Sequence, residues 1–206
     1  YLLNDYLENI YEMYKSHEYS HVILQVMADS SSSRRNGTIG LKMLASILNP
    51  LGFTECEDYN SFITNKYSYI NSDKKGKKIF EEFISKNKIN IEFRKSRDNK
   101  YPDMLIKVDD NYFILEHKLT NGGGGSQNAE INEIIDFTRY DEENEKYHYV
   151  SCLQGDFIQY LTEKSTQPKN IHQRTNIQNA LKQHPNNYFV NGKALEKLIK
   201  DYMEKE

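Results

Sequence analysis

Three charged side chains interrupt the two segments of this chain that most resemble the centre of a β-sheet. Asp103 stands at the head of PDMLIKV, and Glu116 and Lys118 stand one residue apart near the end of NYFILEHK. Carboxylates and ammonium groups are costly to bury and usually lie on loops or solvated surfaces. Two carboxylates beside one ammonium suit a site for a divalent cation, because Mg²⁺ takes oxygen ligands and usually binds one or two carboxylates. Such an ion activates a water and neutralises charge on a phosphodiester, and a nearby lysine stabilises the transition state.

The two segments are predicted to be antiparallel strands joined by a tight turn. Side chains alternate faces along a strand, and directly paired residues share a face. A turn at Asp109 and Asp110 pairs Asp103 with Glu116, whereas a turn one residue later pairs Asp103 with Lys118. Both registers place the three charged residues on one face, and a three-residue loop would place Asp103 on the other. The site therefore depends on the turn.

The spacing of these residues resembles a known nuclease motif. Pro102-Asp103, twelve intervening residues and then Glu116-His117-Lys118 look like the PD-(D/E)XK motif of the restriction-endonuclease-like superfamily. The resemblance covers about residues 75–155. It implies that Asp103 and Glu116 bind the metal, one or two Mg²⁺ per site, and that Lys118 assists the attacking water. His117 is expected to face away from both neighbours and to pack in the core.

Many members of that superfamily carry a further acid on the helix before the first core strand. A helix is predicted from about residue 74 to 86, with N-caps offered at 71–73 and an apolar face of Ile79, Phe80, Phe83 and Ile84. Glu81 and Glu82 lie almost symmetrically about that face, so periodicity does not separate them. The habit of the family favours Glu81 as the fourth catalytic residue.

Several polar segments are candidates for contact with DNA. Four glycines at 122–125 follow the second strand, and either they form a flexible connector or they approach a phosphate, with Gln127 and Asn128 placed to read an adenine edge. A polar break between helices carries Arg34, Arg35 and Asn36, and residues 167–174 form a similar segment. Basic clusters near the proposed site include Lys77, Lys78 and Arg97. Solvated surface charge is the competing interpretation of each cluster.

The order of elements predicts an α/β fold: a restriction-endonuclease-like core with a central mixed sheet flanked by helices, plus a helical amino-terminal region. We expect a single domain over 1–206, with helices in 1–70, a catalytic core in 71–155 and a helical carboxy-terminal region in 156–206. Strands are predicted at 89–95 and 147–153, and helices at 129–140, 156–161, 175–184 and 193–204.

Composition limits the classes of partner. The formal net charge of -3 excludes a global basic attraction to nucleic acid, although a local basic groove remains compatible with it. No apolar segment has the roughly 18 residues that a membrane helix needs, and the two cysteines are far apart in sequence. No glycine-lysine-serine or -threonine motif follows the glycines, which excludes a nucleoside-triphosphate P-loop. We therefore expect a cytoplasmic protein with no membrane partner and no nucleotide cofactor.

The expected function is that of a type II restriction endonuclease, which cuts double-stranded DNA at a specific sequence and acts as a homodimer. Dimerisation follows from chemistry, since one site cuts one strand and a palindromic target matches two-fold symmetry. The alternatives are a junction resolvase or repair nuclease, a catalytically silent DNA-binding module of the same fold, and an RNA-processing enzyme.

Overall fold

The computed structural model describes residues 32–72, 75–90, 101–120, 125–155, 157–162 and 165–204, and for 32–39, 125–127, 157 and 162 it describes the backbone alone. The chain divides into two compact units, Tyr1–Gly40 and Leu41–Glu206. The proposed helix at 3–14 and the proposed strand over 91–95 lie outside the described residues.

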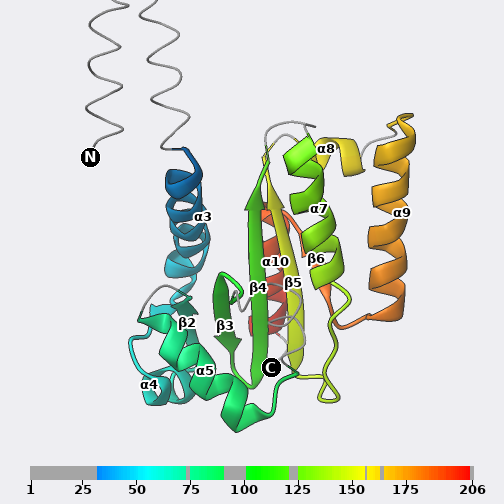
Figure 1. Cartoon of the computed structure of the whole chain (residues 1–206). Helices are drawn as coiled ribbons and strands as arrows, with labels where there is room; N and C mark the ends of the chain where they lie inside the picture. Colours follow the sequence, from blue (N-terminus) through cyan, green and yellow to red (C-terminus); the bar gives the residue numbers. More distant parts are fainter. Residues whose placement is uncertain are drawn as a thin grey trace, which may run out of the picture. The chain divides into compact units, whose positions relative to one another are not determined.

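The described part of the second unit is built around a mixed sheet, whose six strands are hydrogen-bonded in the order β1-β2-β3-β4-β5-β6 (Figure 1). The strands are β1 (Thr54–Glu55), β2 (Tyr67–Asn71), β3 (Met104–Val108), β4 (Asn111–Leu119), β5 (Tyr147–Gln154) and β6 (Tyr188–Val190). Strand β3 is antiparallel to both of its neighbours, β2 and β4, and β5 and β6 continue the sheet in parallel with β4. The predicted α/β class with a mixed central sheet is confirmed.

Helices connect these strands. They are α3 (Ser32–Leu48), a 3₁₀ turn at Asn49–Leu51, α4 (Tyr59–Thr64), α5 (Gly76–Asn87), α7 (Gly125–Phe137), α8 (Phe157–Thr162), α9 (Pro168–Gln183) and α10 (Gly192–Met203). Pro50 lies in the 3₁₀ turn that follows α3, because proline cannot continue an α-helix, and Gly52 ends this turn in the left-handed conformation with φ of 87°.

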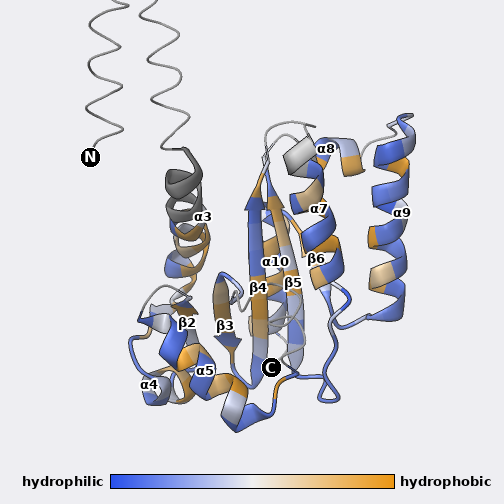
Figure 2. Cartoon of the chain, in the orientation of Figure 1, coloured by the Kyte–Doolittle hydropathy of each residue, from blue (hydrophilic) through white to orange (hydrophobic). Residues whose placement is uncertain are grey.

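Two apolar clusters cover the opposite faces of the sheet (Figure 2). On one face, α5 buries Phe80 and Phe83 against Leu105 and Ile114. On the other face, helices α3 and α10 pack on the strands through Leu44, Leu48, Leu195 and Ile199. Each such side chain contributes about 2 kcal/mol when it is removed from water. Helix α7 adds a third cluster on the α5 face, with Ile131 and Ile134 beside Leu153 of β5.

The helix that precedes the β3–β4 hairpin matches its prediction in packing but not in capping. Its buried side chains are the four expected, Ile79, Phe80, Phe83 and Ile84. It begins at Gly76, and its N-cap residue is Lys75, which makes no side-chain cap. The packing of the apolar face therefore positions α5, and the N-cap residue is Lys75 instead of the predicted Asn71 or Ser72; the third predicted cap, Asp73, lies outside the described residues.

The structure corrects the predicted secondary structure of four segments. Residues 1–70 are not helical throughout, because β1 and most of β2 lie there, and the carboxy-terminal region contains β6. Arg34, Arg35 and Asn36 belong to helix α3 instead of a break between helices. Residues 168–174 form the first half of α9, where Asn170 and Gln173 are buried, so they are not a loop.

Candidate functional site

The turn of the β3–β4 hairpin selects the first of the two registers. Val108 pairs with Asn111 across a two-residue turn at Asp109 and Asp110. Asp109 has a φ of 52°, a left-handed conformation that aspartate tolerates better than most residues. The pairing continues to Met104 opposite Leu115, so that Asp103, one residue before β3, comes level with Glu116.

Glu116 and Lys118 form an ion pair on the face covered by α5 and α7. The Lys118 Nζ atom lies 3.1 Å from Glu116 Oε1, and the two side chains are 14% and 0% exposed. In the register with β5, Glu116 is beside Ser151 and Lys118 is beside Leu153. The strand that carries the pair is apolar in its first half and becomes hydrophilic towards its carboxyl end (Figure 2). Glu116 and Lys118 are thus held in place by a buried strand, as the alternation of side chains predicts.

Asp103, one residue before β3, is hydrogen-bonded to the neighbouring strand β4. Its Oδ2 atom accepts a hydrogen bond from the backbone N–H of His117, with a donor–acceptor distance of 2.8 Å. His117 lies between Glu116 and Lys118, so this bond fixes the Asp103 carboxylate against the segment of β4 that bears both other residues. The backbone carbonyl of Asp103 in turn accepts from the N–H of Ser72 at the end of β2. Three strands therefore meet around the candidate site.

The donor set fits a hard divalent cation. Two carboxylates, from Asp103 and Glu116, are the number that Mg²⁺ commonly takes from a protein, with waters completing its shell. Among the described residues, no group of three or more histidine, cysteine, aspartate or glutamate side chains is placed to hold a metal ion. Asp103 and Glu116 are the residues that would hold such an ion.

The two acids of α5 have different surroundings. Glu81 Oε1 accepts a hydrogen bond of 2.7 Å from the hydroxyl of Tyr101, two residues before Asp103. Glu82 instead forms an ion pair of 2.7 Å with Lys86 on the exposed surface of the helix. Packing thus gives the two acids different contacts, although periodicity does not separate them. Glu81 is the acid that is connected to the segment leading into Asp103.

A residue that the sequence analysis missed completes the surroundings of Lys118. Glu133 of α7 places Oε2 3.1 Å from Lys118 Nζ, at the same distance as Glu116 on the other side. The lysine is thus held between a buried carboxylate and a half-buried one. The signal in the sequence is faint: Glu133 flanks the apolar positions Ile131 and Ile134, which bind α7 to the sheet.

His117 occupies the opposite face of β4, as alternation predicts. It is buried, and its Nε2 atom lies 2.8 Å from Oε1 of Gln154 at the end of β5. Burial lowers the pKa of His117 below its ordinary value, although the hydrogen bond to Gln154 and the charge of Glu116 oppose the shift. The imidazole is therefore neutral near pH 7. Its neighbour in the register is Cys152.

The residues proposed for DNA contact are dispersed. Gln127 and Asn128 lie in the first turn of α7, because this helix begins at Gly125. The Asn128 Oδ1 atom is buried and has no hydrogen-bond partner within the described residues. Lys77 and Lys78 are exposed on α5, and the Lys77 ammonium lies over the ring of Tyr101 at 5.3 Å. Arg97 lies outside the described residues.

Comparison with known proteins does not identify a relative of this chain. No family model, no curated protein and no solved structure matches the chain. In the described part of the chain, every helix is too short or too polar to cross a membrane.

Proposed function

We propose that this chain is a metal-dependent endonuclease that hydrolyses phosphodiester bonds of double-stranded DNA. The observation that carries the proposal is the hydrogen bond from the His117 backbone to Asp103, because it brings that carboxylate to the strand segment on which Glu116 and Lys118 form an ion pair. This hydrogen bond and the ion pair support the assignment of Asp103, Glu116 and Lys118 to the acid, the second acid and the amine of the PD-(D/E)XK motif.

Asp103 and Glu116 would hold Mg²⁺, which would neutralise charge on the phosphate and lower the pKa of a bound water. Lys118 orients the attacking water and stabilises the negative charge that develops on the phosphoryl oxygens. The water oxygen bonds to phosphorus as the bond from phosphorus to one ester oxygen breaks. The departing oxygen takes up a proton, so one product ends in a phosphate monoester and the other in a hydroxyl.

Glu133 acts on this chemistry through Lys118. When the Glu116 carboxylate is engaged by a cation, Glu133 remains as the partner that keeps the ammonium beside the site. We assign Glu133 as a positioning residue for that reason, and Glu81 as the acid that fixes Tyr101 next to the Pro102-Asp103 step.

The finer proposal is a type II restriction endonuclease that acts as a homodimer on a specific sequence. Its support is chemical: one site cuts one strand, and two-fold symmetry matches a palindromic target. Sedimentation of the chain with and without duplex DNA tests the dimer. Digestion of a plasmid of known sequence with Mg²⁺, followed by sequencing of the ends, tests the specificity.

The catalytic assignment is tested on linear duplex, four-way junction and RNA substrates in parallel. We expect Mg²⁺-dependent cutting of linear duplex by the natural chain, and a loss of about 10³-fold in Asp103→Asn, Glu116→Gln and Lys118→Ala. Binding of duplex in Ca²⁺ should persist in the lysine variant. Cutting that is unchanged in these variants would overturn the assignment, and a preference for junctions or RNA would move the activity to another substrate.

A further inference from the structure

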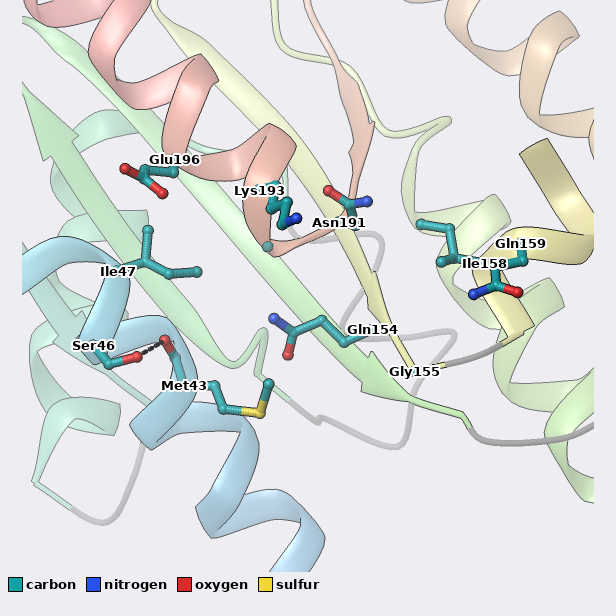
Figure 3. Close-up of a pocket in the computed structure, with 11 residues that line it drawn as sticks. Met43, Ser46, Ile47, Gln154, Gly155, Ile158, Gln159, Asn191, Lys193 and Glu196 are labelled. Atoms are coloured by element: carbon teal, nitrogen blue, oxygen red, sulfur yellow. Dashed lines mark hydrogen bonds between the residues drawn. The ribbon is translucent and has the colours of Figure 1, made fainter. Parts of the chain in front are cut away.

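A groove lies on the face of the sheet opposite the candidate catalytic pair, beyond the carboxyl end of β5. Its volume is about 620 Å³, within the usual range for ligand sites. Four elements contribute to it: α3, the end of β5, α8 and the start of α10 (Figure 3). It is lined by Met43, Ile47, Gln154, Ile158, Asn191 and Lys193, among others.

The chemistry of the groove is that of a surface for a nucleotide. Met43, 36% exposed, and Ile47 give an apolar wall that suits the face of a base. Gln159 brings an amide group, whose paired donor and acceptor match the edge of an adenine, and Gln154, whose Oε1 atom is engaged with His117, brings its Nε2 donor. Gln154 points into the groove from the end of β5 (Figure 3). This combination of apolar wall and amides is absent from the exposed face of α5, where the basic residues were expected to bind DNA.

The charge of the groove favours an anion. Lys193 is exposed, and within the described residues it makes no ion pair, whereas Glu196, the acid of the lining, is neutralised by Lys200 at 2.6 Å. Asn191 caps α10 by accepting the N–H of Ala194 at 2.8 Å, which leaves the positive end of the helix dipole beside Lys193. The uncompensated charge at the groove is therefore positive.

The position of Gln154 depends on a glycine. A Cβ atom at Gly192 would lie 2.6 Å from Gln154 Nε2, closer than any ordinary contact. The other end of the same amide, the Oε1 atom, lies 2.8 Å from the Nε2 atom of His117. Gln154 is thus fixed between the first residue of α10 and the residue that separates Glu116 from Lys118.

This arrangement connects the groove to the catalytic strand. Gln154 pairs in register with Leu119, directly after Lys118, so groove and candidate site lie at the ends of the same two strands. We infer that the groove binds the DNA strand beside the scissile bond, with Lys193 on a phosphate and the amide of Gln154 on the adjoining base. The inference rests on the proposed function, since it makes the groove a part of the DNA-binding surface.

Duplex binding in Ca²⁺, where cleavage does not interfere, tests the inference with a matched pair of charge reversals. Lys193→Glu should weaken binding at least 10-fold and reduce the salt dependence of binding by about one phosphate contact. Lys182→Glu makes the same charge change on the exposed surface of α9 and should bind like the natural chain. Equal effects of the two variants would overturn the inference.

A second variant removes the base contact without a change of charge. Gly192→Ala displaces the Gln154 amide and should leave the affinity for mixed-sequence duplex nearly intact while lowering the preference for adenine-containing sites by about 10-fold. Circular dichroism on each variant establishes that it is folded. Unaltered sequence preference in Gly192→Ala would contradict the role of Gln154.

Further measurements distinguish a failure of the groove inference from a failure of the proposed catalytic function. Titration of the natural chain with 2′-deoxyadenosine 5′-monophosphate, with and without duplex, shows whether a free nucleotide occupies the groove. If duplex DNA does not displace the nucleotide that the chain has bound, the inference is overturned. A natural chain that binds duplex through Lys193 but does not cut it with Mg²⁺ would support the groove and defeat the catalytic proposal, and a chain that binds no duplex would defeat both.

Discussion

The two faces of β4 differ most sharply at its carboxyl end. On one face Glu116 and Lys118 carry opposite charges and are compensated by each other and by Glu133. On the other face, one residue away, His117 is a neutral ring joined to the amide of Gln154. The same strand thus keeps ionised groups where catalysis is proposed and uncharged hydrogen-bonding groups where DNA is proposed to bind. Alternation of side chains alone produces this separation.

Of the changes that test this comparison, we expect the largest effect from removing one charge of the ion pair on the ionised face. Lys118→Met leaves the fully buried Glu116 carboxylate without its partner on β4, which should cost about 3 kcal/mol in the free energy of unfolding. The double variant Glu116→Gln/Lys118→Met removes both charges and should recover most of that loss. Urea denaturation of the natural chain and both variants measures it, and a single variant as stable as the double would show that the pair is not coupled.

The next effect distinguishes the two glutamates of α7. Glu133→Gln removes the second carboxylate from Lys118 and should reduce the rate of cleavage by about 10-fold to 100-fold, while KM for the duplex stays the same. Glu130→Gln, on the same helix, is the matched control and should cut at the natural rate. Single-turnover kinetics separates the rate from binding. A Glu133→Gln enzyme with weakened binding and an unchanged rate would argue for a purely structural role.

A smaller effect compares the neighbouring acids of α5. Glu81→Gln weakens the contact with Tyr101 beside the Pro102-Asp103 step and should slow cleavage by about 10-fold. Glu82→Gln breaks only a solvent-exposed pair with Lys86, which contributes little to stability. Its cleavage rate should match that of the natural chain. If the two variants were equally slow, the assignment of Glu81 over Glu82 would fail.

The smallest signal should come from the two buried cysteines, Cys152 on the uncharged face of the sheet and Cys56 in the cluster on the α5 face. Burial, with a further contribution from the negative charge of Asp103, raises the pKa of Cys152 to about 12, and burial also raises the pKa of Cys56. Thiolate forms only as the pH approaches the raised pKa of each thiol, so both thiols should resist a disulfide reagent at pH 8 in the folded chain. Both should react at once in urea. Rapid labelling of Cys152 in the native protein would contradict its burial.

The hairpin was predictable because its physics is local. The apolar residues of β3 and β4 and the two aspartates between them specify the strands and the turn, and the register then places Asp103 level with Glu116. Strand β6 has only three half-buried residues, too few for a pattern. Strand β2 falls almost entirely within residues 1–70, which are predicted to be helical, and its five residues are too few for periodicity to distinguish a strand from a helix.

The remaining parts of the site depend on contacts between distant segments. Lys118 and Glu133 are brought together by the packing of α7, and Glu81 and Tyr101 by the packing of α5. Nothing in the local sequence distinguishes these acids from their neighbours. Gln154 and Lys193 were missed for the same reason, since the groove exists only when β5 and α10 meet.

The mixed pairing of β4 has a consequence for the order of folding. Its antiparallel partner β3 is reached through a two-residue turn, whereas its parallel partner β5 follows only after the chain has passed through α7. Short-range pairing forms faster than pairing that must close a long loop. We expect the hairpin to assemble first, with Glu116 and Lys118 still hydrated. Dehydration of the ion pair then becomes a late event, and amide protons of β5 should acquire protection after those of β3.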